Sequence, residues 1–333
     1  MQSKTGLIIL ILSFSLSGFR FSLAQQPTFC IAVITEINGE AFLKKVNKSE
    51  FSKTCWGTQL FEGDEIKTSD KSEAKLLFSN SSFISLGPNS MIKISKKESP
   101  ATEPVGDVRN ILSMIINLSN YTLEREEKND VGALAGLRSG STEQSIGLTS
   151  PCNTLIKTDR PSFSWVTKKS FDNYVVKLYN SKGLVWSKKV SENTMSYPEN
   201  EKELEFGESY FWNVEGEYPC NTGETANHKF SVLSLEKSKE VEENENTIRN
   251  TFKNDLESSS LHSFLGAYYY NKGLLQDAIS EIHIIAKINI DAALPHEILG
   301  SLYSEVGDKD KAINELQKAL ILAKNKDKCL NPL

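Results

Sequence analysis

An internal repeat of 34 residues near the C-terminus constrains the fold of this chain more than any other feature. Moving residues 262–281 along the chain by 34 positions superposes them on residues 296–315 with eight identities in twenty positions. The identical pairs are His262/His296, Leu265/Leu299, Gly266/Gly300, Tyr269/Tyr303, Gly273/Gly307, Ala278/Ala312, Ile279/Ile313 and Glu281/Glu315. A fixed period of this length is the signature of one supersecondary unit whose copies stack on each other.

Both copies resemble tetratricopeptide repeats (TPRs), which are pairs of helices joined by a short turn. Leu-Gly and a Tyr fall on the first helix, a Gly lies near the turn, and Ala-Ile falls on the second helix. The residues that carry this signature are Leu265, Gly266, Tyr269, Ala278, Leu299, Gly300, Tyr303 and Ala312. We therefore expect a pair of α-helical TPR-like repeats over 258–325, in which the small residues let the helices approach and the tyrosines fill between them.

The resemblance implies that the face formed by the first helices binds an extended peptide of a protein partner. The positions on this face that we expect to contact a partner are Tyr270, Asn271, Glu297, Ser301 and Glu305, with Ser263, Ala267 and Ser304 beside them. The Lys and Asn residues with which some relatives bind a terminal carboxylate are largely missing, so the partner is unspecified. A homodimer through the repeat region is an alternative.

Two repeats cannot bury their own ends, because about three are normally needed for stability. A charged segment, residues 236–257, precedes the repeats and is predicted to be a solvated helix or linker. We expect the helix around 240–256, the domain before it or a second copy of the protein to cover the exposed apolar surface.

The N-terminus has the layout of a secretory signal peptide over residues 1–24. Lys4 precedes an apolar run from Gly6 to Phe19, and Ser22-Leu-Ala24 supplies small residues before a cleavage site. An uncleaved anchor is the alternative. We expect an exported protein, periplasmic or associated with the envelope of a bacterium, with no transmembrane segment after cleavage of the signal.

Residues 30–97 are predicted to be a small all-β unit, because apolar residues alternate with polar ones through most of this stretch. Asn38-Gly39 between two such runs, 31–37 and 40–46, indicates a tight hairpin, because this dipeptide adopts the positive φ angles of a type I′ turn. A second pair of strands is expected around the Asn80-Ser-Ser82 turn, followed by a corner at Gly87-Pro-Asn-Ser90.

The spacing of residues in this unit resembles the FecR-type domain. The matching positions are Gly57, Leu60, Gly63-Asp64, Ile66, Thr68, Ala74, Leu76, Phe78, Leu86 and Asn89-Ser90. Transmembrane members of that family relay a signal to a cytoplasmic sigma factor. Only five residues precede the apolar run here, so we expect the exported domain without that signalling circuit, and a FecR-like signalling regulator stays an alternative function.

Residues 98–148 are expected to form a short helix, from apolar spacing between Ile111 and Leu118, and a Gly-rich connector. The Gly-rich stretch lacks both the dinucleotide fingerprint and a P-loop, so a phosphate-binding role is disfavoured.

Residues 149–235 are predicted to be a β-sandwich. Short apolar runs separated by Pro and Gly contain three of the four tryptophans, Trp165, Trp186 and Trp212, and a hairpin is expected at Asn180–Gly183. The pattern resembles immunoglobulin-like (Ig-like) or fibronectin-III-like domains. Core packing is the preferred role for Trp165 and Trp212, and a peptidoglycan- or glycan-binding module that stacks sugars on exposed aromatic rings is the alternative.

Five cysteines are compatible with disulfides in an exported chain. We expect bridges Cys30–Cys55 and Cys152–Cys220, which would stabilise the fold by on the order of 3.5 and 4.4 kcal/mol in the chain-entropy model. Buried free thiols are the alternative, and Cys329 has no partner in this scheme.

Enzymatic chemistry finds little support in the sequence. The four histidines are scattered, and no Ser-nucleophile elbow, metal-binding H-x-x-E pattern or C-x-x-C pair is present. A net charge of −5 without a dense basic patch disfavours nucleic acid as a partner. We therefore expect a multidomain, non-catalytic binding or scaffolding protein of the cell envelope, without metal, cofactor or catalytic residues.

Overall fold

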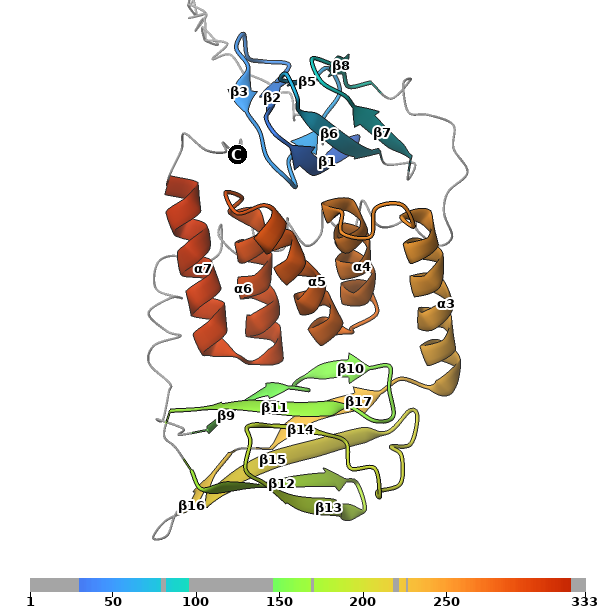
Figure 1. The fold of residues 1–333 in the computed structure, drawn as a ribbon, viewed down its shortest axis with the longest axis vertical. Helices are drawn as coiled ribbons and strands as arrows, with labels where there is room; N and C mark the ends of the chain where they lie inside the picture. The colour runs from blue at the N-terminus through green and yellow to red at the C-terminus, as the bar shows by residue number, and fades with distance from the viewer. Residues whose placement is uncertain are drawn as a thin grey trace, which may run out of the picture.

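Three layers follow one another in the computed structural model, which describes residues 30–78, 82–95, 146–168, 171–217, 222–225 and 227–324. A β unit lies on one side of a layer of helices, and a second β unit lies on the other side (Figure 1). The fold is thus a mixed α+β arrangement of small, mainly antiparallel sheets followed by a helical bundle. The expected signal peptide, the helix at 111–118 and most of the Gly-rich connector lie outside the described residues.

The N-terminal β unit consists of two four-stranded antiparallel sheets, ordered β4-β1-β6-β7 and β3-β2-β5-β8. Its strands are β1 (Ala32–Asn38), β2 (Ala41–Lys44), β3 (Ser52–Lys53), β4 (Gln59–Leu60), β5 (Glu65–Thr68), β6 (Glu73–Phe78), β7 (Phe83–Leu86) and β8 (Met91–Lys93). Alternation places Ile34 and Leu76 of one sheet against Leu43 and Ile66 of the other, all buried. This confirms a small all-β unit over the predicted stretch.

The predicted hairpin at Asn38-Gly39 is wrong. Gly39 has the positive φ of 87° that a turn needs, but β1 pairs with β4 and β6, whereas β2 pairs with β3 and β5. The chain therefore crosses from one sheet to the other at this point. The reason is that β1 is buried on both faces, because Ile34 points into the β unit and Val33 packs against the helices. Such a strand belongs in the centre of a sheet.

The second β unit packs a three-stranded sheet, ordered β14-β11-β9, against a larger one, ordered β10-β17-β15-β12-β13 with β16 beside β15. Its strands are β9 (Ile146–Ser150), β10 (Thr154–Ile156), β11 (Ser162–Thr167), β12 (Asn173–Asn180), β13 (Gly183–Val190), β14 (Thr194–Ser196), β15 (Ser209–Glu217), β16 (Thr222–Glu224) and β17 (His228–Val232). The predicted hairpin is confirmed, because β12 and β13 pair up to Asn180 opposite Gly183. Trp165, Trp186 and Trp212 are all buried in the core between the sheets.

The described part of the chain then forms five helices, which stand side by side in one layer (Figure 1). They are α3 (Leu235–Thr251), α4 (Ser259–Asn271), α5 (Leu275–Ile288), α6 (Leu294–Val306) and α7 (Lys309–Lys324). The side chains of Ser234 and Ser258 accept hydrogen bonds from the first turns of α3 and α4, which explains where these helices begin. No helix among the described residues has both the length and the apolar character needed to cross a membrane.

The two helix pairs α4–α5 and α6–α7 repeat the same contacts at an offset of 34 residues. A Cβ added at Gly266 would lie 3.0 Å from Ile282, and one added at Gly300 would lie 2.6 Å from Leu316, which occupies the equivalent position. Both glycines therefore lie where the two helices of a pair approach closely, as predicted, and the approach is closer at Gly300 than at Gly266.

Paired polar groups obey the same repeat. The imidazole Nδ1 of His262 lies 2.6 Å from Glu281 Oε2, and His296 Nδ1 lies 2.6 Å from Glu315 Oε2. Each pair ties the first helix of a copy to its second helix. The repeated His and Glu positions thus have a structural role in both copies.

Helix α3 covers the outer side of α4, as expected for a segment that shields one end of the repeats. Val241 and Ile248 of α3 are buried in the same apolar cluster as the repeat helices. At the opposite end of the layer, Leu320 and Ile321 of α7 are 55% and 61% exposed.

Candidate functional site on the helical repeat

The predicted partner-binding positions occupy one face of α4 and α6. Tyr270 and Asn271 lie at the end of α4, and Glu297, Ser301 and Glu305 follow one another along α6 at helical spacing. All five remain at least partly accessible to solvent. The Tyr270 hydroxyl donates a long hydrogen bond of 3.5 Å to Glu305 Oε1, so the face brings residues of both copies together.

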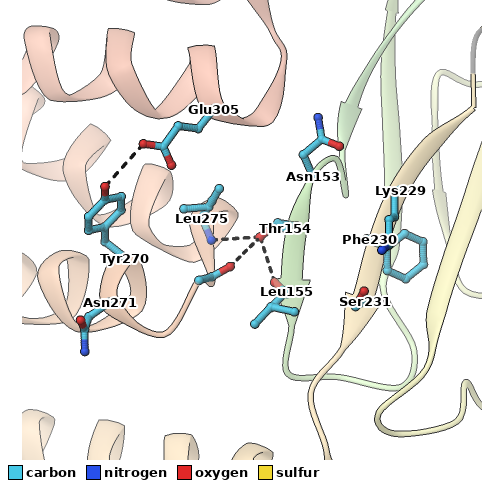
Figure 2. A pocket seen from close by; sticks show the side chains of 11 residues that line it. Asn153, Thr154, Leu155, Lys229, Phe230, Ser231, Tyr270, Asn271, Leu275 and Glu305 are labelled. Atoms are coloured by element: carbon cyan, nitrogen blue, oxygen red, sulfur yellow. Dashed lines mark hydrogen bonds between the residues drawn. The ribbon is translucent and has the colours of Figure 1, made fainter. Parts of the chain in front are cut away.

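A cleft of about 570 Å³ opens where this face meets the second β unit (Figure 2). Leu155 and Leu275 provide apolar lining at the boundary between the two layers. Polar side chains from both sides complete the cleft: Asn153, Thr154, Lys229 and Ser231 from the β unit, and Tyr270, Asn271 and Glu305 from the helices. Three of the five predicted residues, Tyr270, Asn271 and Glu305, thus form one wall of the cleft, whereas Glu297 and Ser301 do not line it.

The edge strand β10 and the residue before it fix the position of this second wall. The amide of Leu155 donates to the carbonyl of Gly273 at 3.0 Å, and the amide of Leu275 donates to Thr154 Oγ1 at 2.9 Å. Asn153 Nδ2 donates to the carbonyl of Val306 at 3.2 Å. These partners border the equivalent turns of the two helix pairs, so one short segment binds both copies.

Lys157 forms a second connection between the β unit and the helices. Its Nζ lies 2.7 Å from Glu245 of α3 and 3.6 Å from Asp277 of α5, and it lies over the ring of Tyr269 at 4.7 Å. Burial raises the pKa of Asp277, although the Lys157 charge opposes this shift. Burial would also raise the pKa of Glu245, but hydrogen bonds led by that from Lys157 lower it below its ordinary value. One cation thus holds three helices to the β unit.

The N-terminal β unit lies at the opposite end of the helices from the second β unit (Figure 1). The indole Nε1 of Trp56 donates to Ser263 Oγ at 3.1 Å, and the Trp56 side chain is only 2% exposed. Because Ser263 lies on the first-helix face, part of the predicted partner site is filled by the chain itself. Ala267, one turn further along α4, is also fully buried.

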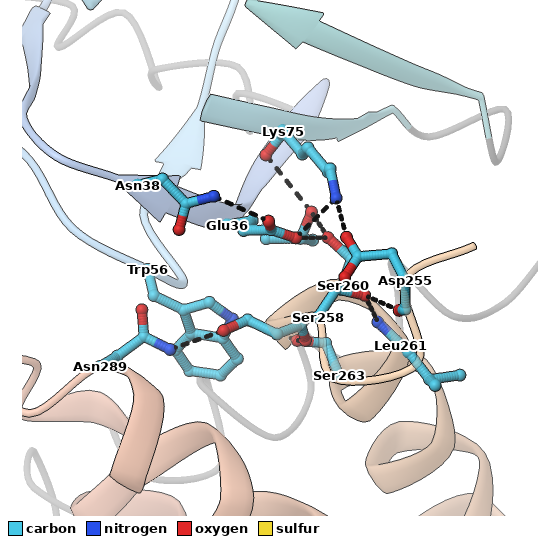
Figure 3. A network of polar contacts seen from close by, with 12 residues as sticks. Glu36, Asn38, Trp56, Lys75, Asp255, Ser258, Ser260, Leu261, Ser263 and Asn289 are labelled. Atoms are coloured by element: carbon cyan, nitrogen blue, oxygen red, sulfur yellow. Dashed lines mark hydrogen bonds and ion pairs between the residues drawn. The ribbon is translucent and has the colours of Figure 1, made fainter. Parts of the chain in front are cut away.

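Polar groups surround this contact. Lys75 Nζ lies 3.0 Å from Glu36 and 2.6 Å from Asp255, which precedes α4. Burial would lower the pKa of Lys75, but the hydrogen bonds that it donates to these two carboxylates raise it. Ser260 Oγ donates to Thr35 Oγ1 at 3.0 Å. Residues of the β unit and of the helices that are far apart in sequence thereby form one polar network (Figure 3).

The Cys30–Cys55 bridge stays a prediction, although the two thiols are not bonded to each other in the structure. Antiparallel pairing places Thr58 opposite Ile34, so Cys30 lies near the start of β1 and Cys55 lies beyond Ile34. The Cys30 thiol instead donates to the carbonyl of Ala32 at 3.2 Å, and burial raises its pKa to about 11.

The Cys152–Cys220 bridge stays a prediction, because Cys220 lies outside the described residues. Cys152 is buried, and burial raises the pKa of its thiol to about 12.

A further titratable pair joins the two helix pairs. His283 Nε2 lies 2.7 Å from the hydroxyl of Tyr303, and burial lowers the pKa of this histidine. Within the ranges that the structure describes, no three His, Cys, Asp or Glu side chains are grouped so that they could hold a metal ion.

Sequence reasoning missed the residues that join the layers, namely Trp56, Asn153 and Lys157. Trp56 carried a usable signal, because it is the one tryptophan outside the sandwich zone. Asn153 and Lys157 are single polar residues in loops or at strand ends, and nothing in their spacing marks them.

Comparison with known proteins gives little guidance. No protein-family model and no curated protein match the chain. Among solved structures, there is a likeness to a β-1,2-glucanase from Parabacteroides distasonis, with 11% identity and a TM-score of 0.22. It covers 56% of this chain and 35% of that one, so the chain spans about a third of the enzyme's length. A likeness at this level carries no argument about fold or activity.

Proposed function

We propose that this chain is a non-catalytic binding and scaffolding protein of the bacterial cell envelope. In this proposal a FecR-type domain and an Ig-like or fibronectin-III-like sandwich flank two TPR-like repeats, and the repeats bind a protein partner. The envelope location rests on the signal-peptide layout of residues 1–24. The binding role rests on the repeat face and its cleft.

The observation that carries the proposal is the division of the first-helix face into two parts. Trp56 and Ser263 fill one part inside the molecule. Tyr270 and Glu305 line the cleft in the other part, and Ser301, one helical turn before Glu305 on α6, is also partly accessible. A concave site with apolar lining and a few convergent polar groups is the usual form of a binding site.

The contacts at both ends of the helices favour a scaffold over a flexible string of domains. Hydrogen bonds, ion pairs and a shared apolar cluster connect the helices to both β units. A partner would therefore meet a surface of fixed geometry, which lowers the entropy lost on binding.

Site-specific photo-crosslinking in cells tests this proposal. A photoreactive residue replaces Ser301 in the accessible part of the face, and the matched control replaces Ser280, an exposed serine on α5. We expect a discrete crosslinked protein from position 301 and none from position 280. Identical crosslinking patterns from the two positions, or no crosslink from position 301, would reject partner binding at the repeat face.

A further inference from the structure

A row of side chains crosses the outer face of the larger sheet in the second β unit. The pairing of neighbouring strands places Leu184 of β13 opposite Tyr179 of β12, Tyr179 opposite Phe211 of β15, and Phe211 opposite Lys229 of β17. Directly opposed residues of adjacent strands point to the same face of a sheet. Leu184, Tyr179, Phe211 and Lys229 therefore form one continuous line, which we call the outer row.

The outer row is apolar where a solvent-facing sheet is normally polar. Leu184 is 58% exposed and Phe211 is 38% exposed. The residues that follow Phe211 and Lys229 in sequence, Trp212 and Phe230, point inward and are almost fully buried in the core. An antiparallel sheet with one solvated face usually places polar residues on that face, and a contiguous exposed apolar strip indicates an interaction surface.

The outer row is continuous with the cleft at the repeat face. Lys229 ends the row and also lines the cleft, where Glu305 stands on the helical side. Lys229 is exposed, and the structure gives it no ion pair among the described residues. Lys177, on the same sheet face, is in contrast paired with Glu215. Lys229 thus brings to the junction of row and cleft a positive charge that has no direct ion pair among the described residues.

We propose that the outer row extends the partner-binding cleft and takes an extended peptide segment of the partner. The peptide's apolar side chains lie on Leu184, Tyr179 and Phe211, and an acidic side chain or a terminal carboxylate pairs with Lys229. Three strand spacings of about 4.8 Å make the row about 14 Å long, which matches about four extended residues. This inference rests on the proposed function, because it names the chemistry of the segment that reaches the repeat face.

The composition of the row favours a peptide over a glycan. Sugar rings stack on wide aromatic faces, but Leu184 has no ring and the three tryptophans of this unit are buried. A row that is aliphatic at one end, aromatic in the middle and cationic at the other end matches a short peptide with apolar residues beside an acidic one. Complementary charge at Lys229 would fix the direction of binding.

The test uses a displayed library of random octapeptides selected on the full chain. Affinities of the selected peptides are then measured by fluorescence anisotropy for the wild type, Phe211→Ser and Lys229→Glu. We expect selected peptides to combine apolar residues with one acidic group, and each substitution to weaken binding at least about tenfold. A peptide whose acidic residue is replaced by lysine should bind Lys229→Glu better than it binds the wild type.

Matched controls separate the row from general surface effects. Val166→Ser removes a 53% exposed apolar side chain from the other sheet, and Lys93→Glu reverses an exposed charge in the N-terminal unit. Both controls should bind the selected peptides as the wild type does. Thermal melts of all variants exclude loss of folding as the cause of weaker binding.

Two results would overturn the inference. The first is a failed peptide test. In that case no peptide is enriched, or the enriched peptides bind Phe211→Ser and Lys229→Glu as tightly as they bind the wild type. The other is retention of the protein on purified cell wall that depends on Phe211 and is unaffected by the selected peptides, which would assign the row to a glycan. A specific crosslink from position 301 together with either result would leave the proposed function standing and remove only the outer row from it.

Discussion

Replacement of Trp56 by alanine should destabilise the helical layer, although Trp56 belongs to the N-terminal β unit. Its side chain is 2% exposed and lies in one apolar cluster with residues of α4, α5 and α6. Its indole also donates the 3.1 Å hydrogen bond to Ser263. The alanine variant removes both kinds of contact at once.

The magnitude follows from the buried area. An aromatic side chain of this class buries about 150–250 Å², which at about 25 cal/mol per Å² corresponds to about 4–6 kcal/mol. Large-to-small substitutions of Trp in cores cost about 3–5 kcal/mol, and the lost hydrogen bond accounts for about 1 kcal/mol of such a total. Ser263 keeps its own bond to the Ser259 carbonyl at 2.6 Å, so no buried donor is left unpaired. We expect the free energy of unfolding to fall by about 3–5 kcal/mol.

Urea unfolding followed by the far-UV circular dichroism of the helices measures this effect. Val46→Ala, at a 70% exposed position of the same β unit, is the matched control and should change the unfolding free energy by less than about 0.5 kcal/mol. A double-mutant cycle of Trp56→Phe with Ser263→Ala isolates the hydrogen bond, with an expected coupling of about 1 kcal/mol. If the helices of Trp56→Ala unfold at the same urea concentration as those of the wild type, the β unit does not support the repeat and the reasoning fails.

Three further predictions concern single residues. Gly300→Ala should lower the free energy of unfolding by about 1 kcal/mol more than Gly266→Ala does. The new Cβ at position 300 would lie 2.6 Å from the branched carbon of Leu316, whereas the one at position 266 would lie 3.0 Å from the flexible tip of Ile282. Urea unfolding of the two variants measures the difference. Burial would raise the pKa of Glu315, but hydrogen bonds from Lys318 and His296 lower it. Its contribution to stability is therefore present above about pH 4.3 and is lost as the pH falls through the lower folded-state pKa, and Glu315→Gln should flatten the fall in melting temperature between about pH 5 and 3. Cys30, with a pKa of about 11, should react slowly with iodoacetamide at about pH 8 in the folded protein and rapidly in urea, as mass spectrometry can follow.

The helical repeat and the core of the second β unit could be predicted because their signals are local and redundant. Eight repeated identities fix the repeat period, and the structure places Gly266 and Gly300 at the predicted close approaches. Trp165 and Trp212 stand at alternating positions among apolar residues and are buried as expected. In each case several residues carry the same information, so one atypical position does not mislead the prediction.

The pairing of strands and the docking of the β units could not be predicted, because they depend on contacts between distant segments. Asn38-Gly39 does form a turn, but a turn does not specify whether the strands beside it pair with each other. The pairing of β1 depends instead on the burial of Val33, which packs on helices more than 200 residues away in sequence. The same holds for the candidate site, where one wall was predicted from the repeat and the other, with Lys229, was not.

The β units account for how only two repeats can form an ordered layer. A repeat array normally stabilises its outer copies with further repeats or capping helices, and here α3 covers one side through Val241 and Ile248. The turns at Gly273 and Val306 are bound by the segment 153–155, and the start of α4 is bound through Ser260 and Ser263. Groups that would be solvent-exposed at helix ends in a free array are therefore satisfied inside the molecule. The cost is a shorter open face, because Trp56 covers Ser263 on α4, and the surface that the proposed outer row adds to this face belongs to the neighbouring sheet.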